Sequence, residues 1–94
     1  MKVVYKYPID ITDEQTLKIP LGSKILSVIE QHNKMVLYAI VSPGVEYTRE
    51  IIIRIVGTGR EIPFSLDDFK FMGGVKLHNG ELVFHVFIKE GCVC

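Results

Sequence analysis

The chain is dominated by β-branched side chains, and this excess constrains its fold more than any other feature. Val and Ile together occur 23 times among the 94 residues, whereas Ala occurs once, at Ala39. Branched side chains fit a pleated strand and lose rotamer freedom in a helix. No window of about twelve residues shows the i, i+3, i+4 apolar spacing of an amphipathic helix. The sequence therefore predicts an all-β chain.

Turn residues divide the apolar segments into short strands. Asn79-Gly80 favours positive φ angles between two such segments and predicts a hairpin. The expected strands span residues 2–7, 16–20, 24–31, 35–42, 46–56, 71–77 and 81–89. The capping-box spacing of Thr12 and Gln15, or the N-cap candidate Ser65, allows at most one short helical turn. We expect a small antiparallel sandwich or open barrel built from hairpins.

Several expected strands carry apolar residues on both faces. In the longest strand, Ile51, Ile53 and Ile55 occupy one face, and Ile52 and Val56 lie on the other. An antiparallel sheet usually leaves one face to water. A second sheet or a second subunit must therefore cover the other face, which predicts a homo-oligomer of two or more copies.

Length and charge restrict the function classes. A chain of 94 residues forms one domain, which we place at residues 1–90, with a C-terminal tail at residues 91–94. Eleven Lys and Arg residues balance eleven Asp and Glu residues, which argues against a DNA- or RNA-coating protein with a basic face. The apolar runs are shorter than the roughly 20 residues of a membrane helix, and lysines interrupt the N-terminal run, unlike in a signal peptide. We expect a cytoplasmic protein without membrane contact.

The segment Gly57-Thr58-Gly59-Arg60 is the strongest candidate for a binding loop. Two glycines let the backbone approach a ligand and turn its N–H groups toward an anion. Thr58 adds a hydroxyl, and the Arg60 guanidinium can bind a phosphate through two hydrogen bonds. The alternative is a glycine-bearing turn that ends a strand, because the Walker pattern is absent and a lone G-x-G is weak evidence.

The arginines of the chain cluster around this segment. All three of them, Arg49, Arg54 and Arg60, fall within twelve consecutive residues. Concentrating the bidentate cation here favours an anion site, with Arg54 projecting from the middle of the strand. The alternative for Arg54 is an ion pair with Glu50 or another acid.

Tyr38 and His85 complete the candidate ligand-binding residues. Tyr38 is the large polar-tipped group of an otherwise apolar strand, so its ring is a candidate for stacking on a base. Filling the edge of the core is the default role for such a ring. His85 lies between Phe84 and Val86, where a hydrogen-bonded structural role is more common than ligand binding.

Signals for catalysis or metal binding are weak. The sequence has no nucleophile elbow and no HExxH motif. Asp67 and Asp68 are neighbours, so their side chains diverge in a strand and lie about 100° apart on a helical turn. Cys92 and Cys94 form a C-x-C pair, which cannot make a zinc site alone and seldom closes an unstrained disulfide. We expect neither an enzyme, nor a metal site, nor a cofactor.

Five segments of the chain resemble a widespread family of small phage-encoded proteins. They are KVVYKYP at residues 2–8, ITDEQ at 11–15, KILSV at 24–28, GTG at 57–59 and LVFHVF at 82–87. The resemblance covers nearly the whole chain. Tyr38 departs from it, because the family is associated with a Trp at that position.

This family is similar to phage sponge proteins, which bind the nucleotide signals of host CBASS or Thoeris immune systems and hold them without cleavage. The resemblance implies an oligomeric β domain with ligand pockets near subunit contacts, acting in the cytoplasm of the infected host cell. It implies a cyclic oligonucleotide or an ADP-ribose-type signal as the ligand. Two alternatives remain: a structural phage protein that makes only protein contacts, and a small phosphodiesterase-like enzyme.

Overall fold

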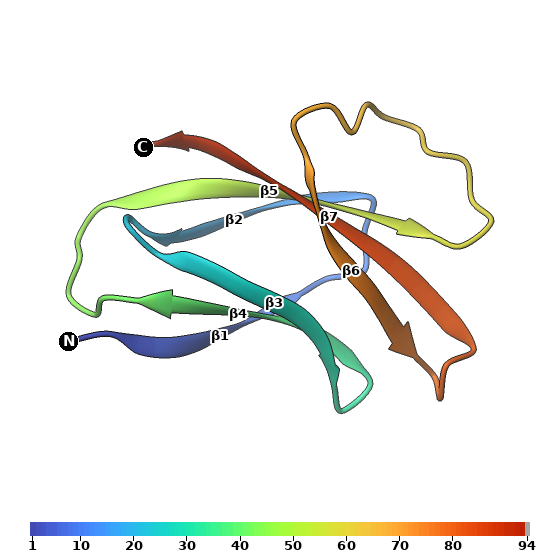
Figure 1. Ribbon diagram of the computed structural model, residues 1–94, viewed down its shortest axis with the longest axis horizontal. Coiled ribbons are helices and arrows are strands. Elements are labelled where there is room, and N and C mark those ends of the chain that lie inside the picture. The colour runs from blue at the N-terminus through green and yellow to red at the C-terminus, as the bar shows by residue number, and fades with distance from the viewer. Residues whose placement is uncertain (94) are drawn as a thin grey trace.

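Seven strands make up the part of the chain that the structure, a computed structural model, describes, namely the backbone of residues 1–93 and the side chains of residues 1–91. The strands are β1 (Val3–Ile9), β2 (Glu14–Pro20), β3 (Lys24–Gln31), β4 (Lys34–Val41), β5 (Thr48–Gly57), β6 (Lys70–Leu77) and β7 (Leu82–Val93). They form a three-stranded sheet, β1-β4-β3, and a four-stranded sheet, β2-β5-β7-β6, both antiparallel (Figure 1). No helix occurs in these residues, and the expected all-β fold is confirmed.

The core consists of the apolar inner faces of the two sheets. In β5, Ile51, Ile53 and Ile55 are buried on one face, as the alternation of the sequence predicts. From the other sheet, β4 places Leu37 and Ala39 in the same cluster. The chain changes sheets between β1 and β2 and again between β2 and β3, so that the first half of the sequence contributes to both sheets.

Two hairpin turns of the same sequence, His-Asn, join the sheets at one end. His32 and Asn33 link β3 to β4, and His78 and Asn79 link β6 to β7, all four with φ between 52° and 61°. The His78 backbone N–H donates to Asn33 Oδ1 at 2.7 Å, so one turn is hydrogen-bonded to the other. The positive φ predicted for Asn79-Gly80 is confirmed, with Gly80 at 87°.

The two places where the sequence allowed a short helical turn are turns or strands. Gln15 lies in β2, and its side-chain amide exchanges two hydrogen bonds with the Asp10 backbone, at 2.6 and 3.1 Å. Ser65 Oγ accepts from the Asp67 N–H at 3.1 Å, which closes a local turn and starts no helix. The capping-type residues therefore satisfy nearby backbone groups in loops, as such side chains often do.

Three strands extend at least two residues beyond their expected bounds, and β2 does so by beginning at Glu14 where a start at residue 16 was expected. β1 continues through Pro8 to Ile9, because an edge strand tolerates a residue without an N–H. β7 continues to Val93, which pairs with Arg49 of β5. Residues 91–93 thus extend the sheet where a tail was expected, while residue 94 and the side chain of Cys92 lie outside the described residues.

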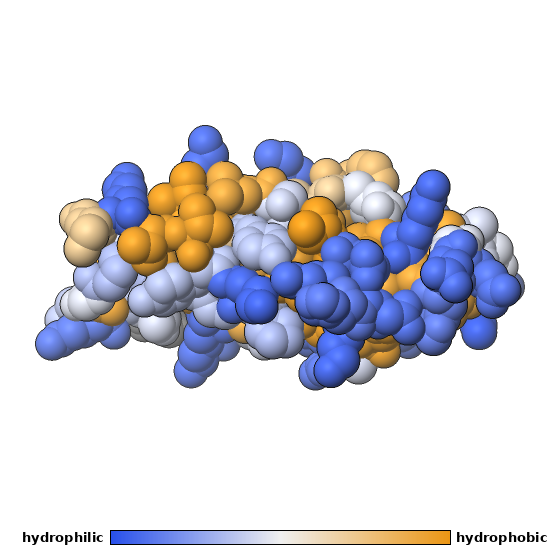
Figure 2. All heavy atoms as spheres, turned by 90° about the horizontal axis from the view of Figure 1, so that it is seen from below, coloured by the Kyte–Doolittle hydropathy of each residue, from blue (hydrophilic) through white to orange (hydrophobic). Residues whose placement is uncertain are grey.

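The outer face of the three-stranded sheet carries exposed apolar side chains. Val4 of β1 is 57% exposed and Ile29 of β3 is 47% exposed. Val36 and Ile40 of β4 stand between these edge strands in the register. Hydrophobic side chains gather at the end of the molecule that holds the N-terminus, and hydrophilic ones cover much of the other end (Figure 2). Within the described residues, the chain offers no helix with the length and apolarity to cross a membrane.

Candidate functional site

The candidate site begins at the turn that ends β5. The Arg60 N–H donates to the Gly57 carbonyl at 3.2 Å and closes a four-residue turn. The Thr58 N–H donates to the Val83 carbonyl at 3.2 Å, which ties the turn to the start of β7. Gly59 has a φ of +83°, in the left-handed region that strains other residues. The segment is therefore a tight structural turn, and its contact with an anion stays a prediction.

A hollow of about 610 Å³ opens beside this turn. The turn contributes Gly57, Gly59 and Arg60 to its lining, the β1–β2 connection contributes Asp13, and β7 contributes Phe84. Ligand pockets typically enclose roughly 300–1,000 Å³, so this hollow has the volume of a small-molecule site. Three residues of the predicted loop thus line one concavity together with an aromatic ring.

Both signs of charge are present in this hollow. Arg60 is exposed and forms no ion pair with any described residue. Asp13 and Glu61 also line the hollow. The guanidinium suits a phosphate, whereas carboxylates accept hydrogen bonds from hydroxyl or amino groups and repel phosphate. A ligand that carries both phosphate and sugar or base donors matches this combination better than a bare anion.

The Arg60 stem and the Phe84 ring lie against the Gly57 backbone. A Cβ at this position would lie 3.4 Å from Arg60 Cγ and 3.7 Å from Phe84 Cε1. Gly57 and Phe84 are also direct partners in the β5–β7 register. The arginine stem and the aromatic ring therefore flank the turn backbone on the wall of the hollow, at distances that would also admit a Cβ.

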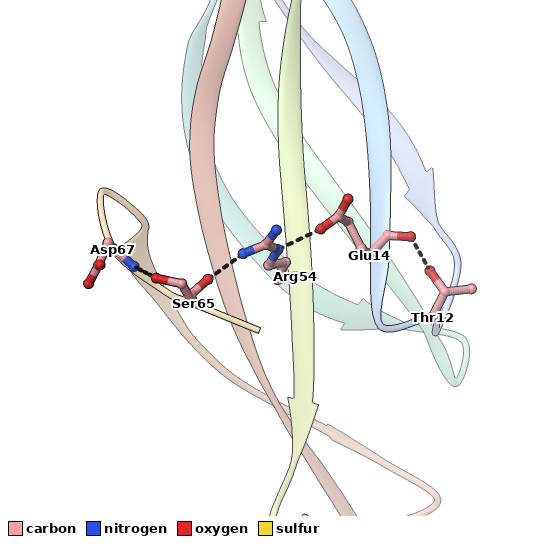
Figure 3. Close-up of polar contacts among 5 residues, drawn as sticks. All are labelled: Thr12, Glu14, Arg54, Ser65 and Asp67. Carbon is pink, nitrogen blue, oxygen red and sulfur yellow. Dashed lines mark hydrogen bonds and ion pairs between the residues drawn. The ribbon is translucent and has the colours of Figure 1, made fainter. Parts of the chain in front are cut away.

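Arg54, the second predicted ligand arginine, contacts several groups of the protein. Its Nε lies 2.6 Å from Glu14 Oε2, and its Nη1 donates to the Ser65 carbonyl (Figure 3). The Phe64 and Phe69 rings each lie 4.6 Å from its guanidinium carbon. The side chain is 20% exposed. The ion-pair role considered above is therefore observed for Arg54, with Glu14 as the acid, and its contact with a phosphate stays a prediction.

The Arg54 contacts hold the long β5–β6 connection onto the four-stranded sheet. This connection, residues 58–69, lies at the end of the molecule opposite the two termini (Figure 1). It contains no strand or helix, so its position depends on side-chain contacts such as those of Phe64 and Phe69. Because Arg60 belongs to the same connection, the Arg54 contacts also restrain the loop from which Arg60 projects.

Thr58 and His85 form a pair beside the hollow. Thr58 Oγ1 lies 2.9 Å from His85 Nε2 and 3.3 Å from the Val83 carbonyl. The His85 ring lies 6.4 Å from that of Phe71, centroid to centroid. Neither Thr58 nor His85 belongs to the lining of the hollow. The hydrogen-bonded structural role considered for His85 is thus observed, and contact of these two residues with a ligand stays a prediction.

Tyr38 is not brought to the Gly57 turn. It lies in β4 of the three-stranded sheet, whereas the turn follows β5 of the four-stranded sheet. Its hydroxyl donates to Gln31 Oε1 at 2.7 Å. In the described structure Tyr38 therefore lies on a separate surface from the turn, and its contact with a base stays a prediction.

Sequence reasoning missed the aromatic and acidic parts of this lining. Phe84 lies 27 residues beyond Gly57 and meets it only through the β5–β7 register. Asp13 reaches the same region because its carbonyl accepts from the Ile55 N–H at 3.2 Å. Strand pairing across such sequence separations is not readable from one sequence. Among the described residues, no group of three or more His, Cys, Asp or Glu side chains is arranged to hold a metal ion.

Comparison with known families places these features in a wider group. Residues 1–91 match the family described as Domain of unknown function (DUF7352). The chain belongs to this family. No curated protein and no solved structure matches it. The DUF7352 match includes all seven strands except the last two residues of β7, so the Gly57 turn and its hollow lie within the family domain.

Proposed function

We propose that this DUF7352 protein binds a nucleotide signal at the Gly57 turn and holds it without cleaving it. The resemblance to phage sponge proteins suggests this function, with a cyclic oligonucleotide or an ADP-ribose-type compound as ligand. In that role the protein would remove a host immune signal in the cytoplasm of the infected cell. No reaction is required, only an affinity high enough to lower the free concentration of the signal.

The observation that carries the proposal is the guanidinium of Arg60, which has no ion-pair partner among the described residues and lines the same hollow as Phe84. A charge-assisted fork binds phosphate, and an aromatic ring stacks on a base. The carboxylates of Asp13 and Glu61 are suited to ribose hydroxyls or base amino groups. Together these groups can contact the phosphate, the base and the sugar of a nucleotide, whereas an inorganic anion offers only the first of these parts.

The position of the Thr58–His85 pair is consistent with a protein that holds its ligand without cleaving it. Thr58 and His85 have the hydroxyl–imidazole distance of a nucleophile and its base, 2.9 Å. However, neither residue lines the hollow, and the Thr58 hydroxyl contacts the Val83 carbonyl and the His85 ring of β7. A phosphodiesterase-like activity therefore remains the weaker proposal.

We also propose that the protein works as a homo-oligomer. The outer face of the three-stranded sheet exposes Val4 and Ile29 on strands that are both sheet edges. Contact with a second copy would cover these side chains. Light scattering at micromolar concentration should then give a mass above 10.7 kDa. A monomer of that mass would contradict the oligomer and would leave the single-chain hollow as the whole site.

The proposed function is tested by incubating the protein with cyclic dinucleotides, cyclic trinucleotides and ADP-ribose derivatives, followed by dialysis and heat denaturation. Recovery of an intact bound nucleotide is the expected result. Recovery of a converted product would support the enzyme and overturn sequestration. Retention of no compound across the panel would favour the second candidate, a structural phage protein, for which the exposed apolar face is the specific observation.

A further inference from the structure

A second hollow, of about 390 Å³, lies at the other end of β5. Its lining comes from both sheets: the start of β3, the start of β5, the start of β6 and the end of β7. Polar or charged residues line it together with apolar ones. They are Ser23, Lys24, Arg49, Lys70 and Glu90, beside Ile25, Met72 and Ile88.

Two polar residues of this second hollow are buried. Ser23 is 6% exposed, and its Oγ is buried with no hydrogen-bond partner among the described residues. Arg49 is 9% exposed; its Nη2 donates to the Ser23 carbonyl at 2.6 Å, and its Nη1 lies 2.6 Å from Glu90 Oε2. An unpaired buried hydroxyl is costly unless a ligand or water completes it. The guanidinium is held rigidly and keeps further N–H groups for an acceptor.

The cations outnumber the acids around this hydroxyl. Lys24 and Lys70 are exposed and form no ion pair with any residue in the described part of the chain. With Arg49 they provide three positive charges against one carboxylate, that of Glu90. Two exposed ammonium groups, a fixed guanidinium and a free hydroxyl donor are the groups that bind a phosphate.

Irregularities in strand pairing lie close to these groups. The three register shifts of the structure fall between Ile25 and Ser27, between Arg49 and Ile51, and between Phe71 and Gly73. Each lies in a strand that lines the second hollow, and the third leaves Met72 as the extra residue. β-Bulges redirect side chains and are over-represented beside functional sites. In this protein the shifts lie at or next to the lining residues Ile25, Arg49 and Met72.

We infer that the second hollow is a phosphate-binding site, independent of the Gly57 turn and of the proposed function. Ser23 Oγ, the Lys24 and Lys70 ammonium groups and the Arg49 guanidinium donate to the phosphate. Ile25 and Met72 offer an apolar wall to the organic part of a phosphate monoester. Glu90 keeps Arg49 oriented through its ion pair. Because Glu90 offsets one positive charge, Lys24 and Lys70 supply the net positive charge that attracts the ligand.

The inference is tested by titrating the full-length protein with sodium phosphate at constant ionic strength, adjusted with sodium chloride, and following amide signals by NMR. Saturable shifts at Ser23, Lys24 and Lys70 are expected. They should persist in Arg60→Ala, which separates this site from the Gly57 turn. Shifts that do not saturate, or that are equally large in chloride alone, would overturn the site.

Variants identify the groups involved. Ser23→Ala should weaken phosphate binding about 3- to 10-fold, the range of one hydrogen bond. Lys24→Gln combined with Lys70→Gln should weaken it at least about tenfold. Lys34→Gln, an exposed lysine at the far end of the β3–β4 hairpin, is the matched control and should bind normally. Equal affinities in the double variant and in this control would contradict the inference.

Folding is checked by the thermal transition of each variant. If Ser23→Ala does not fold, Ser23→Thr retains a hydroxyl and the lysine variants, which alter exposed side chains, still decide the question. Weaker binding to the folded double variant of Lys24→Gln and Lys70→Gln supports the site. Unchanged binding to this folded double variant overturns it.

Discussion

The two hollows stand at opposite ends of β5, about 27 Å apart along the strand, and they are built differently. The first is centred on one continuous turn, with an exposed arginine, two carboxylates and an aromatic ring. The second is assembled from four strands of both sheets around a buried arginine and a buried hydroxyl. One cation and two acids line the first hollow, whereas three cations and one acid line the second.

The difference shows that an arginine takes its role from its neighbours. Arg54 is enclosed by Glu14, a backbone carbonyl and two aromatic rings, so it stabilises the fold. Arg49 is buried against Glu90 and the Ser23 carbonyl. Arg60 projects from the turn without an ion-pair partner among the described residues, which leaves it free for a ligand.

The largest expected effect on stability separates Arg54 from Arg60. Arg54→Ala removes an ion pair, a charged hydrogen bond and two cation–π contacts, and should lower the free energy of unfolding by about 3 kcal/mol. Arg60→Ala should change it by less than about 0.5 kcal/mol. Urea denaturation of both variants measures the difference. Similar losses in the two variants would contradict the division between a structural and a free arginine.

A smaller loss is expected at the turn itself. Gly59→Val places a branched side chain at a φ of +83° and should cost about 1–2 kcal/mol of stability. Gly57→Ala is the matched comparison, because its Cβ meets only the flexible Arg60 stem and a ring edge. It should leave stability within about 0.5 kcal/mol of wild type. Equal destabilisation by the two changes would mean that positive φ is not what the turn requires.

The smallest effect lies outside both hollows, in β1. Burial, assisted by the charge of Tyr5, raises the pKa of the Tyr7 phenol above its ordinary value of 10.0. The folded state therefore holds this proton more tightly, so the contribution of Tyr7 is complete below pH 10 and is lost as pH rises through the folded pKa. Urea denaturation between about pH 8 and 11 should show a shallower decline for Tyr7→Phe than for wild type. Identical pH profiles would contradict this assignment.

The fold was largely predictable because it follows from side-chain patterning. The alternation of Ile51, Ile53 and Ile55 specifies the buried face of β5 whatever its neighbours are. Asn79-Gly80 specifies its hairpin through local backbone preferences. Sheet membership was not predictable, because it depends on pairings such as Gly57 with Phe84 that are distant in the sequence.

The two candidate sites also differ in whether their residues are continuous in the sequence. The segment from Gly57 to Arg60 is continuous, so its sequence alone marks it as a turn near a possible ligand. The second hollow has no sequence motif, because Ser23, Arg49 and Lys70 are distant in the sequence and line one hollow only in the folded chain. The engagement of Arg54 was also hidden, since Phe64 and Phe69 appear in the sequence as ordinary loop residues.

Titration calorimetry of Arg60 variants tests the central claim most directly, with the nucleotide that the wild-type protein retains from the panel as ligand. Arg60→Ala should weaken affinity by roughly one to two decades, because a hydrogen bond to a charged group is worth about 1.5–3 kcal/mol. Arg60→Lys keeps the charge without the planar fork and should recover only part of the loss. Unchanged affinity in a folded Arg60→Ala protein would contradict nucleotide binding at the Gly57 turn.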